Sequence, residues 1–196
     1  MKKIAVIPVR SGSKRLPKKN YKDFNSRNLA EIARDKCLAS GIFDEVVISS
    51  DDPYFEELIN CNKVKFLKRS EDLAGDEATT DLVIDFFFKE FSDCESILWV
   101  NSVSPLQPVQ DIKNCGLSLN RSDVDCVMAV NTLYQHCCIS NQPLNFDPKN
   151  PFEKTQDLEP IQRYIYSCMG WKRENYVKCR REGFKGLFPG KIALVE

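Results

Sequence analysis

The sequence lacks the features that mark membrane, secreted and nucleic-acid-binding proteins. No apolar run approaches the roughly 20 residues that a membrane-spanning helix needs, and the lysine-led amino terminus has no apolar signal stretch. The 28 lysines and arginines are balanced by 28 aspartates and glutamates. This balance favours neither nucleic acid nor a membrane surface as a partner. We therefore expect a cytoplasmic protein that binds neither.

Paired cysteine motifs are missing too, although the chain has nine cysteines. An odd number without C-x-x-C spacing argues against a disulfide framework and against a structural zinc site. Cys37, Cys115 and Cys126 fall within apolar patterns, so we expect most cysteines to be small buried hydrophobes. The run His136 to Cys138 has metal-ligand chemistry, but adjacent residues rarely converge on one ion. We expect no metal there.

Neither common glycine-rich phosphate motif is present. The P-loop spacing G-x-x-x-x-G-K-[ST] is absent, and Gly12 has no glycine partners at the spacing of the Rossmann fingerprint. A phosphate site in this chain must therefore depend on charge, on a single glycine and on its place in the fold.

A basic loop follows the first apolar run. Residues 5–7 predict a strand buried on both faces of a parallel sheet, and Pro8 should end its pairing. Five basic residues and Gly12 come next: Arg10, Lys14, Arg15, Lys18 and Lys19. Backbone N–H groups and cations of this kind can hold an anion, most naturally a polyphosphate.

The alternative interpretation of this loop is a solvated basic segment or a run that resembles a nuclear-localisation signal. Its position favours the anion site. In open α/β sheets, ligands bind at the carboxyl ends of the strands, which is where this loop begins.

Strand and helix patterns alternate across residues 1–130, which predicts a parallel sheet with right-handed crossovers. Asp51 and Asp52 should cap the helix that follows the second strand. After the first strand, the expected strands cover residues 45–50, 64–67, 97–100 and 126–130. The expected helices cover residues 29–40, 54–60, 82–91 and 109–119.

The alternation fails after Asn131. Residues 131–163 contain several prolines and few apolar residues, which indicates an excursion and not a second domain. Residues 164–171 and 191–195 could return strands to the sheet. The length of 196 residues fits one domain that carries this excursion.

Three loop segments together resemble one enzyme family. IPVRSGSKRLPKKN, RSEDLAGDEATT and VNSVSPLQ are similar to signature segments of the acylneuraminate cytidylyltransferases, which make CMP-sialic acid and other CMP-nonulosonic acids. The similarity continues more weakly through TQDLEP at residues 155–160 and GLFPGKIALVE at residues 186–196. The resemblance implies an open, mostly parallel Rossmann-like sheet of the nucleotide-diphospho-sugar transferase type, with helices on both faces and a small excursion.

The resemblance also implies an activity. In that family, the enzyme transfers CMP from CTP to the anomeric hydroxyl of an acidic nine-carbon sugar and releases pyrophosphate. By position, Arg10 and Lys19 match the catalytic cations at the triphosphate. The nucleotide-binding positions are Ser11, Gly12, Ser13, Lys14, Asn20, Arg69, Ala78 and Thr80, and the sugar-binding positions are Asn101 and Gln156.

The resemblance implies Mg²⁺ as well, but its ligands are not found in this sequence. Family members hold it with a D-I-D segment that follows the stretch matched by LFPGKIALVE, and this chain stops at Glu196. We expect that the sequence is shortened at its carboxyl end. Asp51, Asp52 and Asp76 remain, although nothing in the sequence places them near phosphates. By analogy, residues 131–163 should form a homodimer interface.

Departures from the family pattern leave the sugar acid open. Gln107 replaces a usual arginine, and Met169-Gly170 replaces a usual Asn-Gly, which permits a non-sialic nonulosonic acid. One alternative is a cytidylyltransferase for another sugar acid, such as the eight-carbon acid of lipopolysaccharide. Another is a CTP-binding protein that has lost catalysis together with its metal ligands.

Overall fold

The fold is built around β1 (Lys2–Pro8), a strand whose middle residues are buried on both faces. The computed structural model describes residues 1–14 and 16–196, so Arg15 of the basic loop lies outside the described residues. In β1, Ala5 and Ile7 face one apolar core, and Ile4 and Val6 face a second core on the other side. This alternation is what a central strand between two helix layers requires.

Within the described residues, one sheet of seven strands has the order β3-β2-β1-β4-β8-β5-β9. β8 runs antiparallel to its neighbours β4 and β5, whereas the other pairs are parallel. The predicted open, mostly parallel sheet is confirmed. The further strands are β2 (Glu45–Ser50), β3 (Val64–Lys68), β4 (Cys94–Val100), β5 (Cys126–Leu133), β8 (Ile161–Lys172) and β9 (Ile192–Val195).

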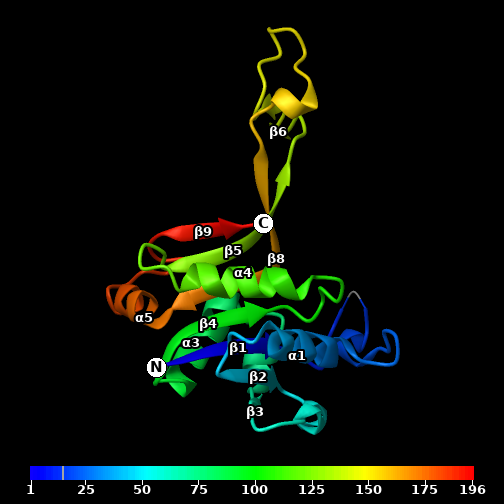
Figure 1. The fold of residues 1–196 in the computed structure, drawn as a ribbon, viewed down its shortest axis with the longest axis vertical. Helices are drawn as coiled ribbons and strands as arrows, with labels where there is room; N and C mark the ends of the chain where they lie inside the picture. Colours follow the sequence, from blue (N-terminus) through cyan, green and yellow to red (C-terminus); the bar gives the residue numbers. More distant parts are fainter. Residues whose placement is uncertain (15) are drawn as a thin grey trace.

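Helices cover both faces of the sheet. α1 (Leu29–Ser40) and α4 (Val109–Leu119) pack side by side over one core, and α3 (Thr80–Glu90) and α5 (Arg173–Arg181) contribute to the other (Figure 1). Shorter helical turns are η1 (Lys19–Tyr21), η2 (Pro53–Leu58), α2 (Glu71–Ala74) and η3 (Thr155–Asp157). Within the described part of the chain, no helix is both long and apolar enough to span a bilayer.

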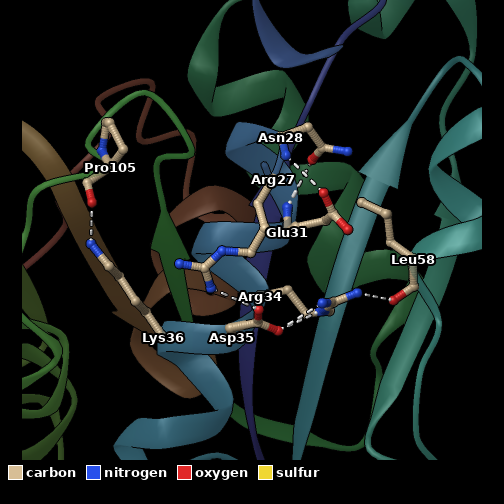
Figure 2. A network of polar contacts seen from close by, with 8 residues as sticks. All are labelled: Arg27, Asn28, Glu31, Arg34, Asp35, Lys36, Leu58 and Pro105. Atoms are coloured by element: carbon tan, nitrogen blue, oxygen red, sulfur yellow. Dashed lines mark hydrogen bonds and ion pairs between the residues drawn. The ribbon is translucent and has the colours of Figure 1, made fainter. Parts of the chain in front are cut away.

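Side chains of helix α1 form hydrogen bonds to two neighbouring segments of the chain (Figure 2). Asn28 and Glu31 form a reciprocal capping box at its start, in which each side chain accepts from the other backbone N–H. Further along, Arg34 donates to the carbonyl of Leu58 at 2.7 Å. Lys36 donates to the carbonyl of Pro105 in the loop after β4. The helix therefore holds both the end of η2 and the β4 loop.

Some local predictions needed correction. The helix expected at residues 54–60 is the 3-10 helix η2, which Asp52 caps by accepting from the N–H of Tyr54 at 2.9 Å. Asp51 does not cap it, because its carboxylate accepts from Ser11 instead. The sequence predicted no helix at α5. Little apolar periodicity marks this segment, because Tyr176 is its buried residue.

The excursion forms an arm that projects from the sheet (Figure 1). β5 and β8 pair beyond the sheet from Val130 with Tyr164 to Leu133 with Ile161, so both strands extend further than predicted. The short strands β6 (Cys138–Ile139) and β7 (Gln142–Pro143) form a hairpin within the arm.

Most of the cysteines are buried, whereas Cys61 and Cys138 are exposed. Cys37, Cys115 and Cys126 are buried, as predicted, and all nine cysteines are free thiols. His136 stacks on Phe152 with 3.9 Å between ring centroids. Its ring is thus part of an aromatic cluster in the arm.

We predict that Gly170→Ala destabilises the protein. Gly170 lies in β8, where an added Cβ would come within 3.0 Å of side-chain atoms of Leu98, Val127 and Leu119. Overpacking of this kind costs about 1–3 kcal/mol. The free energy of unfolding, measured by urea denaturation, should fall by that amount.

Gly12→Ala is the matched control, because a Cβ there would meet no described heavy atom within 4 Å. Equal stability of the two variants would contradict the close packing at Gly170.

Candidate functional site

The loops that follow β1, β2, β3 and β4 meet at one edge of the sheet. β1 lies between β2 and β4, so the chain reverses its direction of winding there. Crevices at such switch points are the usual ligand sites of open α/β sheets. Cavities of about 330 Å³ and 450 Å³ lie at this edge and share the residues Arg10, Gly12, Ala74, Gly75 and Asp76.

The structure brings together every predicted site residue except Gln156. The first cavity is lined by Arg10, Gly12, Lys19, Asn20, Arg69, Ala78, Thr80 and Asn101. The second is lined by Ser11, Ser13 and Lys14 together with Arg10 and Gly12. Gln156 is exposed in η3 of the arm and lines neither cavity.

Arg10 and Lys14 converge on one carboxylate. Arg10 Nη1 lies 2.9 Å from Asp76 Oδ1, and Lys14 Nζ lies 2.7 Å from Asp76 Oδ2. The hydrogen bond from Lys14, followed by that from Arg10, holds the pKa of Asp76 below its usual range. The two predicted phosphate cations thus already hold an anion between them.

Asn20 joins the loops after β1 and β4. Its side-chain N–H donates to the carbonyl of Arg10 at 3.0 Å, and its side-chain oxygen accepts from the hydroxyl of Ser102 at 3.0 Å. Asn20 and Ser102 are both buried, so these bonds form away from water. Asn20 therefore also holds the cavity wall in place.

Arg69 places a buried guanidinium beside the first cavity. The residue is 5% exposed, and its Nη2 donates to the carbonyl of Val9 at 3.4 Å. Its Nε finds no hydrogen-bond partner among residues 1–14 and 16–196. Burial lowers the pKa of Arg69, yet arginine stays protonated in proteins because its pKa is very high. A buried donor without an acceptor is costly, and a ligand can satisfy it.

Sequence reasoning missed Trp99. This residue of β4 lines the first cavity, and its indole N–H is buried without a partner in the described part of the chain. The sequence gave a weak signal only, because Trp99 looks like one more apolar residue of a buried strand. The sequence also did not show where Asp76 lies. In the structure, Asp76 lines both cavities.

The basic loop is tied to the end of β2. The backbone N–H of Ser11 donates to Asp51 at 2.9 Å, and the Ser11 hydroxyl donates to the same carboxylate. Tyr21 donates to Asp52 at 2.5 Å. Burial, and then this bond, raises the pKa of the Tyr21 hydroxyl well above its usual range. Both carboxylates thus position the loop.

The loop after β4 is held by β8. The N–H of Asn101 donates to the carbonyl of Ser167 at 2.9 Å, and Gln107 donates to the hydroxyl of Ser167 at 3.1 Å. Tyr166, just before this serine, takes a left-handed backbone conformation with φ 55°. This is an uncommon, strained state for a residue other than glycine.

The expected magnesium ion stays a prediction. Among the described residues, no three histidine, cysteine, aspartate or glutamate side chains come together as metal ligands. Mg²⁺ commonly needs only one or two carboxylates together with substrate phosphates. Of the aspartates near the site, Asp51 accepts from Ser11, Asp52 from Tyr21, and Asp76 is paired with Arg10 and Lys14.

Known proteins resemble this chain over the whole site. A family model described as cytidylyltransferase matches residues 4–163. The N-acylneuraminate cytidylyltransferase of Streptococcus agalactiae serotype V is 28% identical over 169 residues, which are 82% of this chain and 41% of the relative. The pseudaminic acid cytidylyltransferase of Campylobacter jejuni is 27% identical over 196 residues, covering 90% of this chain and 83% of the relative. The chain thus spans less than half of the streptococcal relative.

Solved structures share the fold at lower identity. A CMP:2-keto-3-deoxy-manno-octonic acid synthetase complexed with CTP superposes with a TM-score of 0.66 at 16% identity, over 92% of this chain and 78% of the other. The 4-diphosphocytidyl-2C-methyl-D-erythritol synthase of Anaerococcus prevotii gives a TM-score of 0.65 at 14% identity, over 99% and 89%. The family match takes in every residue that lines the two cavities, and this chain belongs to the cytidylyltransferase family.

Proposed function

We propose that this chain transfers CMP from CTP to the anomeric hydroxyl of an acylneuraminate or a related nonulosonic acid and releases pyrophosphate. One observation carries the proposal: Arg10, Lys19 and the buried, partly unpartnered Arg69 line a single cavity at the switch point of a cytidylyltransferase fold. Relatives named for N-acylneuraminate, pseudaminic acid and N,N'-diacetyllegionaminic acid support this acceptor class.

The first cavity suits the cytidine. Its volume of about 330 Å³ is at the small end of the range for ligand sites. Arg69 and Trp99 both line this cavity and carry N–H donors, and the carbonyl of cytosine and the ribose hydroxyls are acceptors for such donors. A base that left these donors unpaired would bind more weakly, which gives the site selectivity.

The second cavity suits the triphosphate. It is lined by Arg10, Lys14 and the glycine of the loop, and Lys19 lines the adjoining cavity. The site therefore presents several cations on one side of the bound nucleotide. Cations at this place offset the charge of the phosphate oxygens and hold the chain of phosphates for attack.

In the proposed reaction, the anomeric oxygen forms a bond to the α-phosphorus. The bond from that phosphorus to the oxygen bridging to the β-phosphate breaks, pyrophosphate leaves, and the proton of the attacking hydroxyl passes to water. Arg10 and Lys19 stabilise the charge that builds on the equatorial oxygens and on the leaving group. Asn101 lines the β4 side of the cavity, and its proposed role is to bond a hydroxyl of the acceptor sugar.

Pyrophosphate release tests the proposal. The purified chain is incubated with CTP, with and without magnesium, and with N-acetylneuraminate, pseudaminate, legionaminate or the eight-carbon acid. Release with a nine-carbon acid, and not with UTP in place of CTP, is the expected result. Release with the eight-carbon acid alone favours the alternative enzyme. Binding of CTP without release under any acid favours a CTP-binding protein.

We also propose that the arm forms a homodimer interface. Ile139, Leu144 and Phe152 are 61%, 49% and 78% exposed in this projecting segment. A cluster of exposed apolar side chains on a soluble protein commonly marks an association surface. The support comes from this exposure and from the family resemblance together.

Ile139→Glu should weaken the dimer, because it places a charge in the apolar interface. Light scattering after gel filtration should show a shift from twice the chain mass towards the chain mass. Lys149→Glu, also in the arm, changes charge without removing apolar surface and should leave the mass unchanged. A wild-type chain that is monomeric at micromolar concentration contradicts the interface.

Arg69→Met should separate binding from stability. Replacing a buried charge by an apolar side chain is often neutral or stabilising by about 1 kcal/mol or more, so the free energy of unfolding should hold or rise. CTP binding should weaken by about 1.5–3 kcal/mol, the usual worth of a hydrogen bond to a charged group. Calorimetry and denaturant unfolding measure the two effects.

Arg34→Met is the matched control for this prediction. Arg34 is also buried but has partners in Asp35 and Leu58, so its loss should lower stability and spare CTP binding. Loss of stability in Arg69→Met as large as in Arg34→Met shows that Arg69 serves the fold.

Lys19→Ala should reduce turnover far more than stability. Loss of one cation at the reacting phosphates raises the barrier by about 2–4 kcal/mol, which steady-state pyrophosphate release measures. Lys22→Ala removes a neighbouring exposed lysine that lines neither cavity and should turn over normally. Near wild-type turnover by the Lys19 variant refutes the assignment of this lysine.

A further inference from the structure

Asp76 occupies the place that a phosphate group of the nucleotide needs. We propose that Asp76 is a specificity-determining residue, whose carboxylate stands in for a phosphate between Arg10 and Lys14 and admits only those ligands that displace it. This inference rests on the proposed function, since it assigns the same two cations to the triphosphate.

The carboxylate of Asp76 lies between the two cations as a bound anion would. Each carboxylate oxygen serves one cation, Oδ1 with Arg10 at 2.9 Å and Oδ2 with Lys14 at 2.7 Å. Carboxylates and phosphates accept from arginine and lysine in the same way, through charge-assisted bonds of this length. A phosphate group that binds between the two cations in the same way must therefore take the place of this carboxylate.

The position of Asp76 places it on the path of the ligand. It lines both cavities, so it lies where the nucleoside side of the site meets the phosphate side. Arg10 Nη1 is also within 3.4 Å of the carbonyls of Ala74 and Gly75. The guanidinium therefore closes the loop of residues 74–76 against the basic loop as long as Asp76 is paired.

The ion pairs of Asp76 with Arg10 and Lys14 are also weak enough to break. The side chains of Arg10 and Asp76 are 39% and 38% exposed, and that of Lys14 is 79% exposed. Exposed ion pairs contribute little because water screens them. A triphosphate brings more charge to the two cations than one carboxylate does, so it can displace Asp76, whereas a weakly charged anion competes poorly.

This arrangement separates ligands by charge. Arg10 and Asp76 also line the first cavity, but an uncharged nucleoside there brings no anion to displace the carboxylate, whereas pyrophosphate and CTP do. When pyrophosphate leaves after the transfer, the carboxylate returns to the two cations. Asp76 thus competes with anions for Arg10 and Lys14. An anion without a nucleoside, such as pyrophosphate, has no further contacts in the first cavity and is retained less well.

Asp76→Asn tests the inference by calorimetry with cytidine, pyrophosphate and CTP as probes. Removal of a competing exposed ion pair should tighten the binding of pyrophosphate and CTP by about two- to fivefold and leave cytidine unchanged. The dependence of pyrophosphate binding on salt should persist. Asp76→Glu, which keeps the charge, should behave like the wild type.

Glu77→Gln is the matched control, because it removes the same charge from the next residue, which lines neither cavity. If Glu77→Gln tightens pyrophosphate binding as much as Asp76→Asn does, the effect is general electrostatics and the inference is wrong. Equal or weaker pyrophosphate binding by Asp76→Asn also overturns it, and so does a failure of pyrophosphate to bind either protein.

The outcome is independent of turnover. Pyrophosphate binding to the two proteins can be compared whether or not the chain makes a CMP-sugar, so an inactive chain with the expected shift contradicts the proposed function and supports the role of Asp76. Hydrogen exchange gives a second readout. In the wild type, pyrophosphate should speed the exchange of amides in residues 74–78, because it releases the loop, and in Asp76→Asn this acceleration should vanish.

Discussion

The site depends on the backbone pairing of β1 with a parallel strand on each side. β2 and β4 both pair with β1 in parallel, from Ile4 with Glu45 and with Ile97 onwards. The three strands therefore end at the same edge, and the loops that follow them have to share the space there. Pairing with both neighbours sets the register of β1, and its apolar middle is buried between two helix layers. The position of Arg10 follows from that register.

Two kinds of polar contact shape this edge. Buried contacts, such as those of Asn20 with Ser102 and with Arg10, hold the walls of the first cavity. Exposed contacts, such as the ion pairs of Asp76, hold the loops together at the second cavity. Buried hydrogen bonds resist exchange with water, whereas exposed ion pairs yield to a stronger anion. The first cavity is thus held by buried bonds, whereas the second is closed by exposed contacts that a stronger anion can replace.

Most of the fold and much of the site could be predicted from the sequence, because both depend on local patterns. The apolar runs of the strands and the capping box and glycine of α1 are read over a few residues. Contacts between distant segments could not be predicted. Asp51 accepts from Ser11, forty positions away, and Trp99 differs from other core residues only in the cavity beside it. Helix α5 was not predicted from the sequence, because most of its residues are charged or polar.

β8 is at once a strand of the sheet and a side of the arm, and its pairing with β5 shifts register between the two parts. Its Ser167 carbonyl receives the N–H of Asn101, at the edge where the acceptor sugar is proposed to bind. One backbone thus supports both the arm and the β4 loop, and Tyr166, with its left-handed conformation, lies between these two parts of β8.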